Sequence, residues 1–113
     1  MYKRQATGYY ALFLSCGNGN TATGTDSLRS NTSGCYNTGS GWYALRNNTT
    51  GCQGTAVGVS ALHSNTTGTL NVAVGRSALH NNTTASSNTA VGGCSLFDNT
   101  TGCLLYTSPS PRD

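Results

Sequence analysis

Leucine recurs every 17 residues along most of the chain, and glycine and asparagine keep the same interval. The leucines are Leu28, Leu45, Leu62, Leu79 and Leu96. The glycines are Gly24, Gly41, Gly58, Gly75 and Gly92, and the asparagines are Asn31, Asn48, Asn65, Asn82 and Asn99. A short fixed period of this kind predicts a stack of similar turns of chain, each of which buries its apolar face against its neighbours.

Within each unit, the pattern predicts one short strand and one turn. Thr-Ala-Val followed by glycine, as at Thr55 to Gly58, favours a strand that ends at the glycine. The Asn-Asn-Thr-Thr-Gly stretch favours a turn, because Asn and Gly adopt positive φ at little cost. A helix is disfavoured, since Gly and Thr recur densely and no apolar stripe of helical spacing exists. We therefore predict an all-β protein, a parallel β-solenoid (β-roll) of about six 17-residue coils.

The same phase predicts which side chains lie inside. We expect all five leucines to point into the core together with Val57, Val74 and Val91. The five repeated glycines are predicted turn residues, and the repeated asparagines are predicted to hydrogen-bond along the solenoid as a ladder. Each coil offers little apolar area. We therefore expect either chain association, as a homotrimer, or further coils beyond both ends to supply the missing burial.

The two ends of the chain, residues 1–5 and 103–113, do not follow the repeat. The second resembles a translated transposon-type sequencing adapter, and the first resembles the reverse complement of the same adapter end. Segments of such origin are set apart from the fold, so residues 6–102 are assigned to the repeat array. We expect the two end segments to pack against nothing specific and the array to be a piece of a longer protein. Cys103 shares the repeat position of Cys35 and Cys52, which is compatible with a native residue there.

Composition narrows the classes of partner. Only 8% of residues are charged and 15 are glycine, which is common in disordered chains, but disorder has no reason to keep Leu and Gly in phase. The net charge of +3 arises mainly from Lys3, Arg4 and Arg112 in the end segments. A nucleic-acid interface needs a basic stripe with aromatic platforms, which the repeat lacks. No apolar run is long enough to predict a membrane span.

The cysteines do not have the spacing of a metal site, because no C-x-x-C or C-x-x-H pattern occurs. Cys35 and Cys52 are predicted to stack on adjacent coils, with Cα atoms about 4.8 Å apart. That separation permits a disulfide, but parallel side chains strain its torsion, so we favour free thiols.

Residues for catalysis are scarce. Within the repeat, Asp26 and Asp98 are the available carboxylates, and they lie roughly 20 Å apart at the strand spacing, too far for acid–base work. Cys94 and His80 are a conceivable nucleophile pair, but the position of His80 predicts a solvent-facing side chain. Calcium-binding β-rolls need acidic Gly-Gly-x-Gly-x-Asp repeats, which are not present. The sequence therefore predicts a protein that is not an enzyme and that has no cofactor or metal.

One repeat position is chemically variable and holds Arg29, Arg46, His63, His80 and Phe97. Two interpretations are open. It forms a weakly basic, pH-responsive strip that contacts an acidic glycan, or it is a solvated face on which sequence drifts freely; we favour the second. Trp42 and Tyr43 are suited to stacking on a sugar ring, although only one coil has them. The Asn-x-Ser/Thr sequons at the repeated asparagines fit glycosylation, but the side-chain ladder explains their period better.

The pattern N-T-A-V-G-x-x-A-L-x-x-N-T-T-G resembles repeats in tail-fibre-like and adhesin-like surface proteins of bacteria and phages. The Thr-Ala-Val-Gly core, at 55–58 and 89–92, is similar to the β-roll repeat of trimeric autotransporter adhesin heads. The resemblance implies a non-catalytic structural or adhesive segment of an extracellular fibre, on a cell surface or virion. It also implies a homotrimer and a host-surface glycan or protein as ligand.

The alternative is an ice-binding Thr-rich β-solenoid. Such a protein needs two outward threonines per coil in T-x-T spacing, which Thr21-Ala22-Thr23 provides. The later coils have valine at the second position, so the fibre segment is the favoured prediction.

Overall fold

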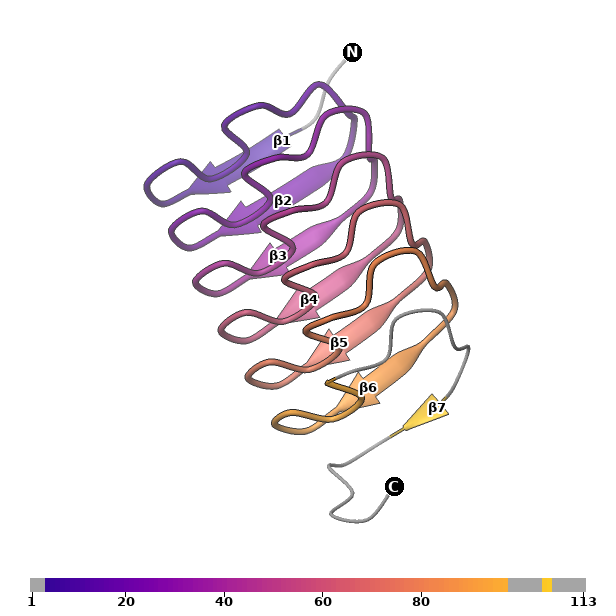
Figure 1. Cartoon of the computed structure of the whole chain (residues 1–113). Coiled ribbons are helices and arrows are strands. Elements are labelled where there is room, and N and C mark those ends of the chain that lie inside the picture. The colour runs from indigo at the N-terminus through magenta and orange to yellow at the C-terminus, as the bar shows by residue number, and fades with distance from the viewer. Residues whose placement is uncertain (1–3, 98–104, 107–113) are drawn as a thin grey trace.

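The computed structural model describes the backbone of residues 4–97 and 105–106, and the side chains of residues 5–97. All regular secondary structure in this part is β-strand. The strands are β1 (Arg4–Thr7), β2 (Asn20–Thr23), β3 (Thr38–Ser40), β4 (Thr55–Val57), β5 (Val72–Val74), β6 (Thr89–Val91) and β7 (Leu105–Tyr106). They form one sheet in the order β1-β2-β3-β4-β5-β6-β7, and every pair is parallel (Figure 1). The predicted all-β parallel solenoid is confirmed.

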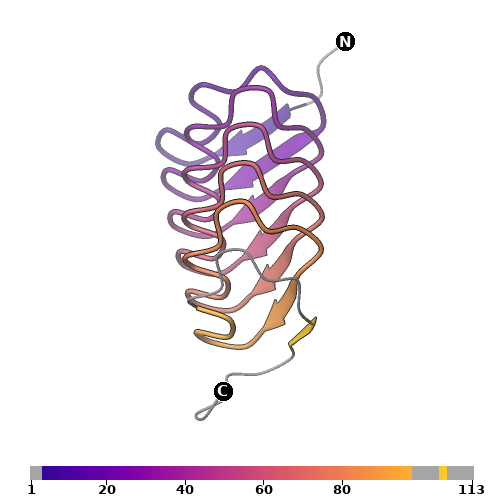
Figure 2. The ribbon, with the colours of Figure 1, turned by 45° about the vertical axis from the view of Figure 1, so that its right-hand side comes forward.

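The repeat period is visible directly in the strand register. Thr38 pairs with Thr55 and Ala56 pairs with Ala73, so each residue faces its equivalent 17 positions later. Between strands, the chain runs through a set of turns and returns to the sheet, and these turns stack as regularly as the strands (Figure 2). The sheet therefore forms one side of the solenoid and the stacked turns form the other.

Consecutive tight turns carry the chain away from the sheet. In the second coil, the amides of Ser27, Arg29 and Asn31 donate to the carbonyls three residues earlier, at 3.2–3.3 Å. Asp26 and Leu28, the third residues of the first two turns, have φ of 60° and 52°, which is type II geometry. This left-handed backbone recurs in each coil at the core leucine and at the residue two before it.

The glycine that ends each strand is required by both conformation and space. Gly58 has φ of +130°, and a Cβ there would lie 2.6 Å from the Gly75 carbonyl oxygen of the next coil. A side chain would collide with backbone that cannot move aside. The turn glycines therefore have the role that the repeat predicts.

The core is a column of leucine lined by alanine. Leu28, Leu45, Leu62 and Leu79 are fully buried, and Leu96 packs against the same cluster in a partly buried position. The leucines thus occupy the core positions that their spacing predicts. Their apolar neighbours are the alanines of the strands and of the turns, namely Ala22, Ala44, Ala56, Ala61, Ala73, Ala78 and Ala90.

The prediction that valines belong to the core was wrong. Val57 is 40% exposed, Val91 is 39% exposed and Val74 is half-buried. Successive side chains of a strand point to opposite sides. In β2 to β6 the buried inward position is an alanine or, in β3, Gly39, so the residues on both sides of it on the pleat point outward. The thin interior leaves room at the strand only for a methyl group or a hydrogen.

The predicted asparagine ladder is present in the described residues. The Nδ2 group of Asn48 donates to Asn31 Oδ1 at 2.7 Å, Asn65 donates to Asn48 at 2.8 Å, and Asn82 donates to Asn65 at 2.8 Å. All four side chains are buried. The fifth member, Asn99, lies outside the described residues. The ladder satisfies amide groups that would otherwise be costly to bury.

A second asparagine column was not foreseen. Its members lie at the start of the strands, Asn20 as the first residue of β2 and the others directly before a strand, and all are buried: Asn20, Asn37, Asn71 and Asn88. The Asn37 backbone amide donates to Asn20 Oδ1 at 2.9 Å, and the Gly54 amide donates to Asn37 Oδ1 at 2.8 Å. The first Asn of the repeat unit was the available signal for this column. The interior is therefore polar on the turn side and apolar between the sheet and the leucines.

Part of each end segment belongs to the sheet, so the expectation that both segments pack against nothing was wrong. Arg4 and Gln5 pair with Asn20 and Thr21 through β1, and β7 pairs with β6. Both end strands are offset by 16 residues, whereas the inner pairs are offset by 17. Parallel pairing uses backbone groups, so an open sheet edge accepts a strand of unrelated sequence. The adapter origin of these segments stays a prediction.

Candidate functional site

The variable repeat position forms a column of planar side chains, which we name the turn strip: Arg29, Arg46, His63, His80 and Phe97. Each member directly follows a core leucine, so the buried leucine column holds the strip in register. The rings of His63 and His80 lie 4.8 Å apart and nearly parallel, at 1°, and His80 stacks on Phe97 at 4.8 Å and 8°. The strip is therefore an ordered surface feature.

An aromatic pair lies beside the strip in the third coil. Trp42 stacks on Tyr43 with ring centroids 4.3 Å apart, and Trp42 is 51% exposed. Tyr43 in turn meets His63 edge-on at 5.7 Å. The platform suggested by the sequence thus exists and joins the strip.

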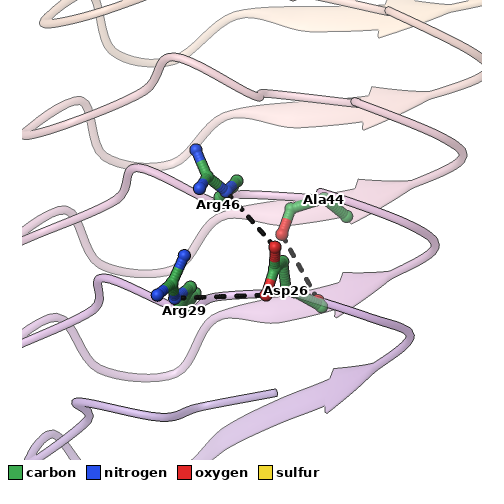
Figure 3. Close-up of polar contacts among 5 residues, drawn as sticks. Asp26, Arg29, Ala44 and Arg46 are labelled. Atoms are coloured by element: carbon green, nitrogen blue, oxygen red, sulfur yellow. Dashed lines mark hydrogen bonds and ion pairs between the residues drawn. The ribbon is translucent and has the colours of Figure 1, made fainter. Parts of the chain in front are cut away.

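Asp26 organises the two arginines, a role that the sequence analysis missed. Its carboxylate is nearly buried and faces Arg29 Nε at 4.0 Å and Arg46 Nε at 3.6 Å (Figure 3). The terminal nitrogens of both guanidinium groups are directed away from Asp26 in this view. The spacing of these residues was a signal for the pairing. Asp26 and Arg29 are three residues apart, and Arg46 occupies the position of Arg29 in the next coil.

Each guanidinium group also lies over an aromatic ring. Arg29 Cζ is 4.7 Å from the centroid of Tyr10, and Arg46 Cζ is 5.1 Å from the centroid of Tyr43. Ion pairing and ring stacking together hold two parallel cations on adjacent coils, against one carboxylate. The arrangement has a local excess of one positive charge and is suited to receiving an anion.

The environment of His63 disfavours its charged form. The pKa of His63 is lowered, first by burial and then by the positive charges of His80 and Arg46. His63 Nδ1 is buried and has no hydrogen-bond partner in the described structure. His80 Nδ1 shares a hydrogen bond with Asn81 Oδ1 at 2.9 Å, so Asn81, and not Cys94, is the polar partner of this ring. Arg29 and Arg46 are the permanent cations of the strip, because a guanidinium group stays protonated.

No group of three or more His, Cys, Asp or Glu side chains able to hold a metal ion is found in the described part of the chain. Asp98 lies outside that part, so the structure does not place it relative to Asp26.

The outer side of the sheet is a second candidate surface, which we name the sheet face. It consists of two columns of outward side chains, one from each end of the strands. The first column is Thr21, Thr38, Thr55, Val72 and Thr89, and the second is Thr23, Ser40, Val57, Val74 and Val91. The face is uncharged throughout these strands and combines methyl groups with hydroxyl groups.

Comparison with protein-family models, with curated proteins and with solved structures found no match. Among the described residues, no helix is long and apolar enough to cross a membrane.

Proposed function

We propose that this chain is a non-catalytic, repetitive segment of an extracellular fibre or surface adhesin, and that it assembles as a homotrimer through the sheet face. The observation that carries the proposal is the outward orientation of the strand valines. A thin solenoid with one leucine per coil leaves Val57 and Val91 at 40% and 39% exposure on an uncharged face. Burying such a face against other copies removes apolar area from water.

Assembly through the sheet face also suits a fibre, since the face runs along the whole stack of strands. Adding coils lengthens the contact and the rod together. Stability of the assembly then rises with repeat number, and the reach of the fibre is set by the number of coils.

Sedimentation of the full chain at micromolar concentration tests the assembly. We expect a trimer for the natural sequence and a monomer for the Val57→Lys and Val91→Lys variants, because a buried ammonium group opposes association. Val59→Lys is the matched control, since Val59 is 39% exposed but lies outside the strands. A monomeric natural chain, or loss of the trimer in Val59→Lys alone, would remove the proposed interface.

The adhesive part of the proposal assigns an acidic polysaccharide to the turn strip. Arg29 and Arg46 are the anion-binding groups, and Asp26 fixes their orientation. Trp42 provides an exposed ring face beside them on which a sugar ring can stack. The ligand class is thus a sugar polymer with carboxylate or sulfate groups.

Binding to immobilised heparin, alginate and dextran tests this assignment. We expect the first two to bind and neutral dextran not to bind, and Arg46→Gln to weaken binding roughly tenfold through loss of a charge-assisted hydrogen bond. Arg76→Gln is the control, because Arg76 is exposed and outside the strip. Preference for heparin over alginate identifies sulfate as the recognised group. Equal losses of affinity in the Arg46 and Arg76 variants would show that binding depends only on net charge, and this would contradict the assignment.

Ice binding is the second candidate, favoured by one observation. Thr21, Thr38 and Thr55 lie in register in the first column of the sheet face at the strand spacing of about 4.8 Å, and Thr89 continues the column after Val72. Measurement of thermal hysteresis separates the candidates. We expect none beyond that of a colligative solute. A hysteresis that Thr55→Lys abolishes and Arg46→Gln leaves unchanged would favour ice binding over the fibre.

A further inference from the structure

The structure also contains a thiol pair that the proposed function does not use. Cys35, between β2 and β3, and Cys52, between β3 and β4, have Sγ atoms only 2.9 Å apart, and both residues are half-buried. The backbone amide of Cys35 also donates to Cys52 Sγ at 3.1 Å. Two unbonded sulfur atoms usually lie farther apart than this.

We propose that Cys35 and Cys52 are a site of covalent modification, at which exchange with a small-molecule disulfide such as oxidised glutathione closes a disulfide between adjacent coils. The inference is independent of the proposed function.

A comparison within the same repeat column explains the close approach. Two coils further on, the equivalent positions are Thr69 and Ser86. The Thr69 amide donates to Ser86 Oγ at 2.9 Å, and the two hydroxyl oxygens are 3.2 Å apart. The backbone of this column therefore suits a hydrogen-bonded hydroxyl pair. When the same backbone carries two larger sulfur atoms, they are held within bonding reach without a change of register.

Backbone packing around the pair prevents the coils from separating. The Gln53 amide donates to the Cys35 carbonyl at 2.9 Å, which ties the two coils together next to the thiols. Gly34, directly before Cys35, has no room for a Cβ, which would collide with the Gly51 carbonyl of the next coil. The sulfur atoms are thus presented to each other by a rigid scaffold. This opposes the preference for free thiols, which rested on the direction of parallel side chains alone.

The same contacts assign different roles to the two sulfur atoms. Cys52 Sγ receives the Cys35 amide, and a hydrogen bond from an amide stabilises a thiolate. The pKa of Cys35 is raised, chiefly by its hydrogen bond to Cys52 and then by burial. The amide at Cys52 Sγ and the raised pKa of Cys35 assign the first attack to Cys52 and the second attack to Cys35.

The exchange proceeds in two balanced steps. The Cys52 thiolate attacks one sulfur of the external disulfide, whose S–S bond breaks, and the leaving thiolate departs with the electron pair and takes a proton from water. Cys35 then loses its proton to water and attacks Cys52 Sγ in the mixed disulfide, which releases the second small thiolate. The two protein thiols are oxidised to one disulfide, and the external disulfide is reduced to two thiols.

The product would brace a part of the solenoid that has little core. The cross-link closes a loop of one repeat, so it restricts the unfolded chain more than the folded one. Small domains with thin cores commonly depend on such links. We therefore expect the oxidised chain to unfold at a higher temperature than the reduced chain.

Peptide mapping of the full chain tests the proposal. After incubation of dilute protein with oxidised glutathione, remaining thiols are alkylated and the chain is cut with trypsin. Cleavage after Arg29, Arg46 and Arg76 puts Cys35 and Cys52 in the separate peptides 30–46 and 47–76. We expect these peptides to be joined by a disulfide that reduction releases, and the peptides with Cys16 and Cys94 not to be joined to them.

Two variants test the assigned roles. Cys35→Ser should retain glutathione on Cys52 as a stable mixed disulfide, whereas Cys52→Ser should react several-fold more slowly at Cys35. Cys16→Ser and Cys94→Ser are controls that should still form the cross-link. The same reaction in denaturant should lose its preference for the 35–52 pair. Alkylation of both cysteines in the folded natural chain, glutathione on each without a cross-link, or a link mainly to Cys16 or Cys94 would overturn the proposal.

Discussion

The interior columns of the solenoid and the turn strip are built on the same backbone, yet they tolerate very different variation. Inside, the leucine position keeps one residue through the described coils, and the repeated Asn31, Asn48, Asn65 and Asn82 are identical and joined to each other. One residue further along the chain from the leucine, the strip changes from arginine to histidine to phenylalanine.

This difference shows what a buried position and a surface position each require from the adjacent coil. A buried amide must find a donor and an acceptor in the adjacent coils, and the same amide in the next coil meets that need, as Asn48 does for Asn31. A surface position needs only a flat side chain with a ring to stack on. The arginines stack on tyrosine rings, and the histidines and Phe97 stack on one another. The leucine column and the ladder from Asn31 to Asn82 are therefore more strictly periodic than the turn strip, where water completes the contacts.

The largest expected effect comes from placing a charge in the leucine column. Leu62 is fully buried, so Leu62→Asp leaves a carboxylate without a partner inside the core and should cost more than about 4 kcal/mol of unfolding free energy. Leu70→Asp is the matched control, because Leu70 is 53% exposed and should change stability by less than about 0.5 kcal/mol. Chemical denaturation measures both. Equal effects at the two leucines would break the distinction between inside and outside.

Removing one member of the asparagine ladder should have the next largest effect. Asn65→Ala removes the hydrogen bond to Asn48 Oδ1 and the one received from Asn82, and leaves buried acceptor and donor atoms unsatisfied. We expect a loss of about 2–4 kcal/mol on that basis. Asn47→Ala, at a half-buried position in the preceding coil, is the control. If the ladder contributes nothing to stability, urea denaturation should show the same small loss of unfolding free energy in both variants.

A third variant compares the stability effect of substituting a turn glycine with that of substituting a surface glycine. Gly58→Ala puts a Cβ at 2.6 Å from the Gly75 carbonyl oxygen and imposes φ of +130° on a residue with a side chain. We expect a loss of about 1–3 kcal/mol from backbone strain. A Cβ at Gly93 meets nothing closer than 4.0 Å, so Gly93→Ala should be nearly neutral. Thermal unfolding followed by circular dichroism gives the comparison, and a stable Gly58→Ala protein would contradict the close stacking.

The smallest expected effect concerns pH and lies in the strip itself. The folded pKa of His63 is lowered from its ordinary 6.5, so below about pH 6.5 the unfolded chain binds a proton more readily than the folded chain. Stability should therefore be complete above this pH and decline as the pH falls further. In the His63→Gln variant this decline should be smaller, which denaturation at several pH values measures. An identical pH profile in both proteins would show that His63 is not the responsible group.

Much of the fold could be read from the sequence because a strict period leaves few solutions. Gly, Leu and Asn in constant phase predict coils of constant length, parallel strands and a leucine interior. The side of the sheet to which valine points could not be read, since Thr-Ala-Val fits either orientation until the volume opposite the alanine is known. The second asparagine column was missed for a related reason, because its satisfaction depends on the neighbouring coil.

The candidate surfaces were predictable in part. The strip was recognisable as a column from the period alone, and Trp42 with Tyr43 as a platform from two adjacent aromatic residues in one coil. The bridging of Arg29 and Arg46 by Asp26 depends on how far each side chain extends between coils. The pairing of β1 and β7 at the sheet edges was also outside sequence reasoning, because backbone pairing carries no signature in the side chains.

By itself, the sequence determined the period, the solenoid, the buried leucines and the asparagine ladder, because a strict period places equivalent residues next to each other in adjacent coils. Only the tertiary structure decided the outward direction of the valines, the arrangement of two arginines around Asp26 and the 2.9 Å separation of the Cys35 and Cys52 sulfur atoms. These features depend on distances of a few ångströms between side chains of adjacent coils. Such distances are set by how tightly the backbones stack, and the repeat pattern does not encode them.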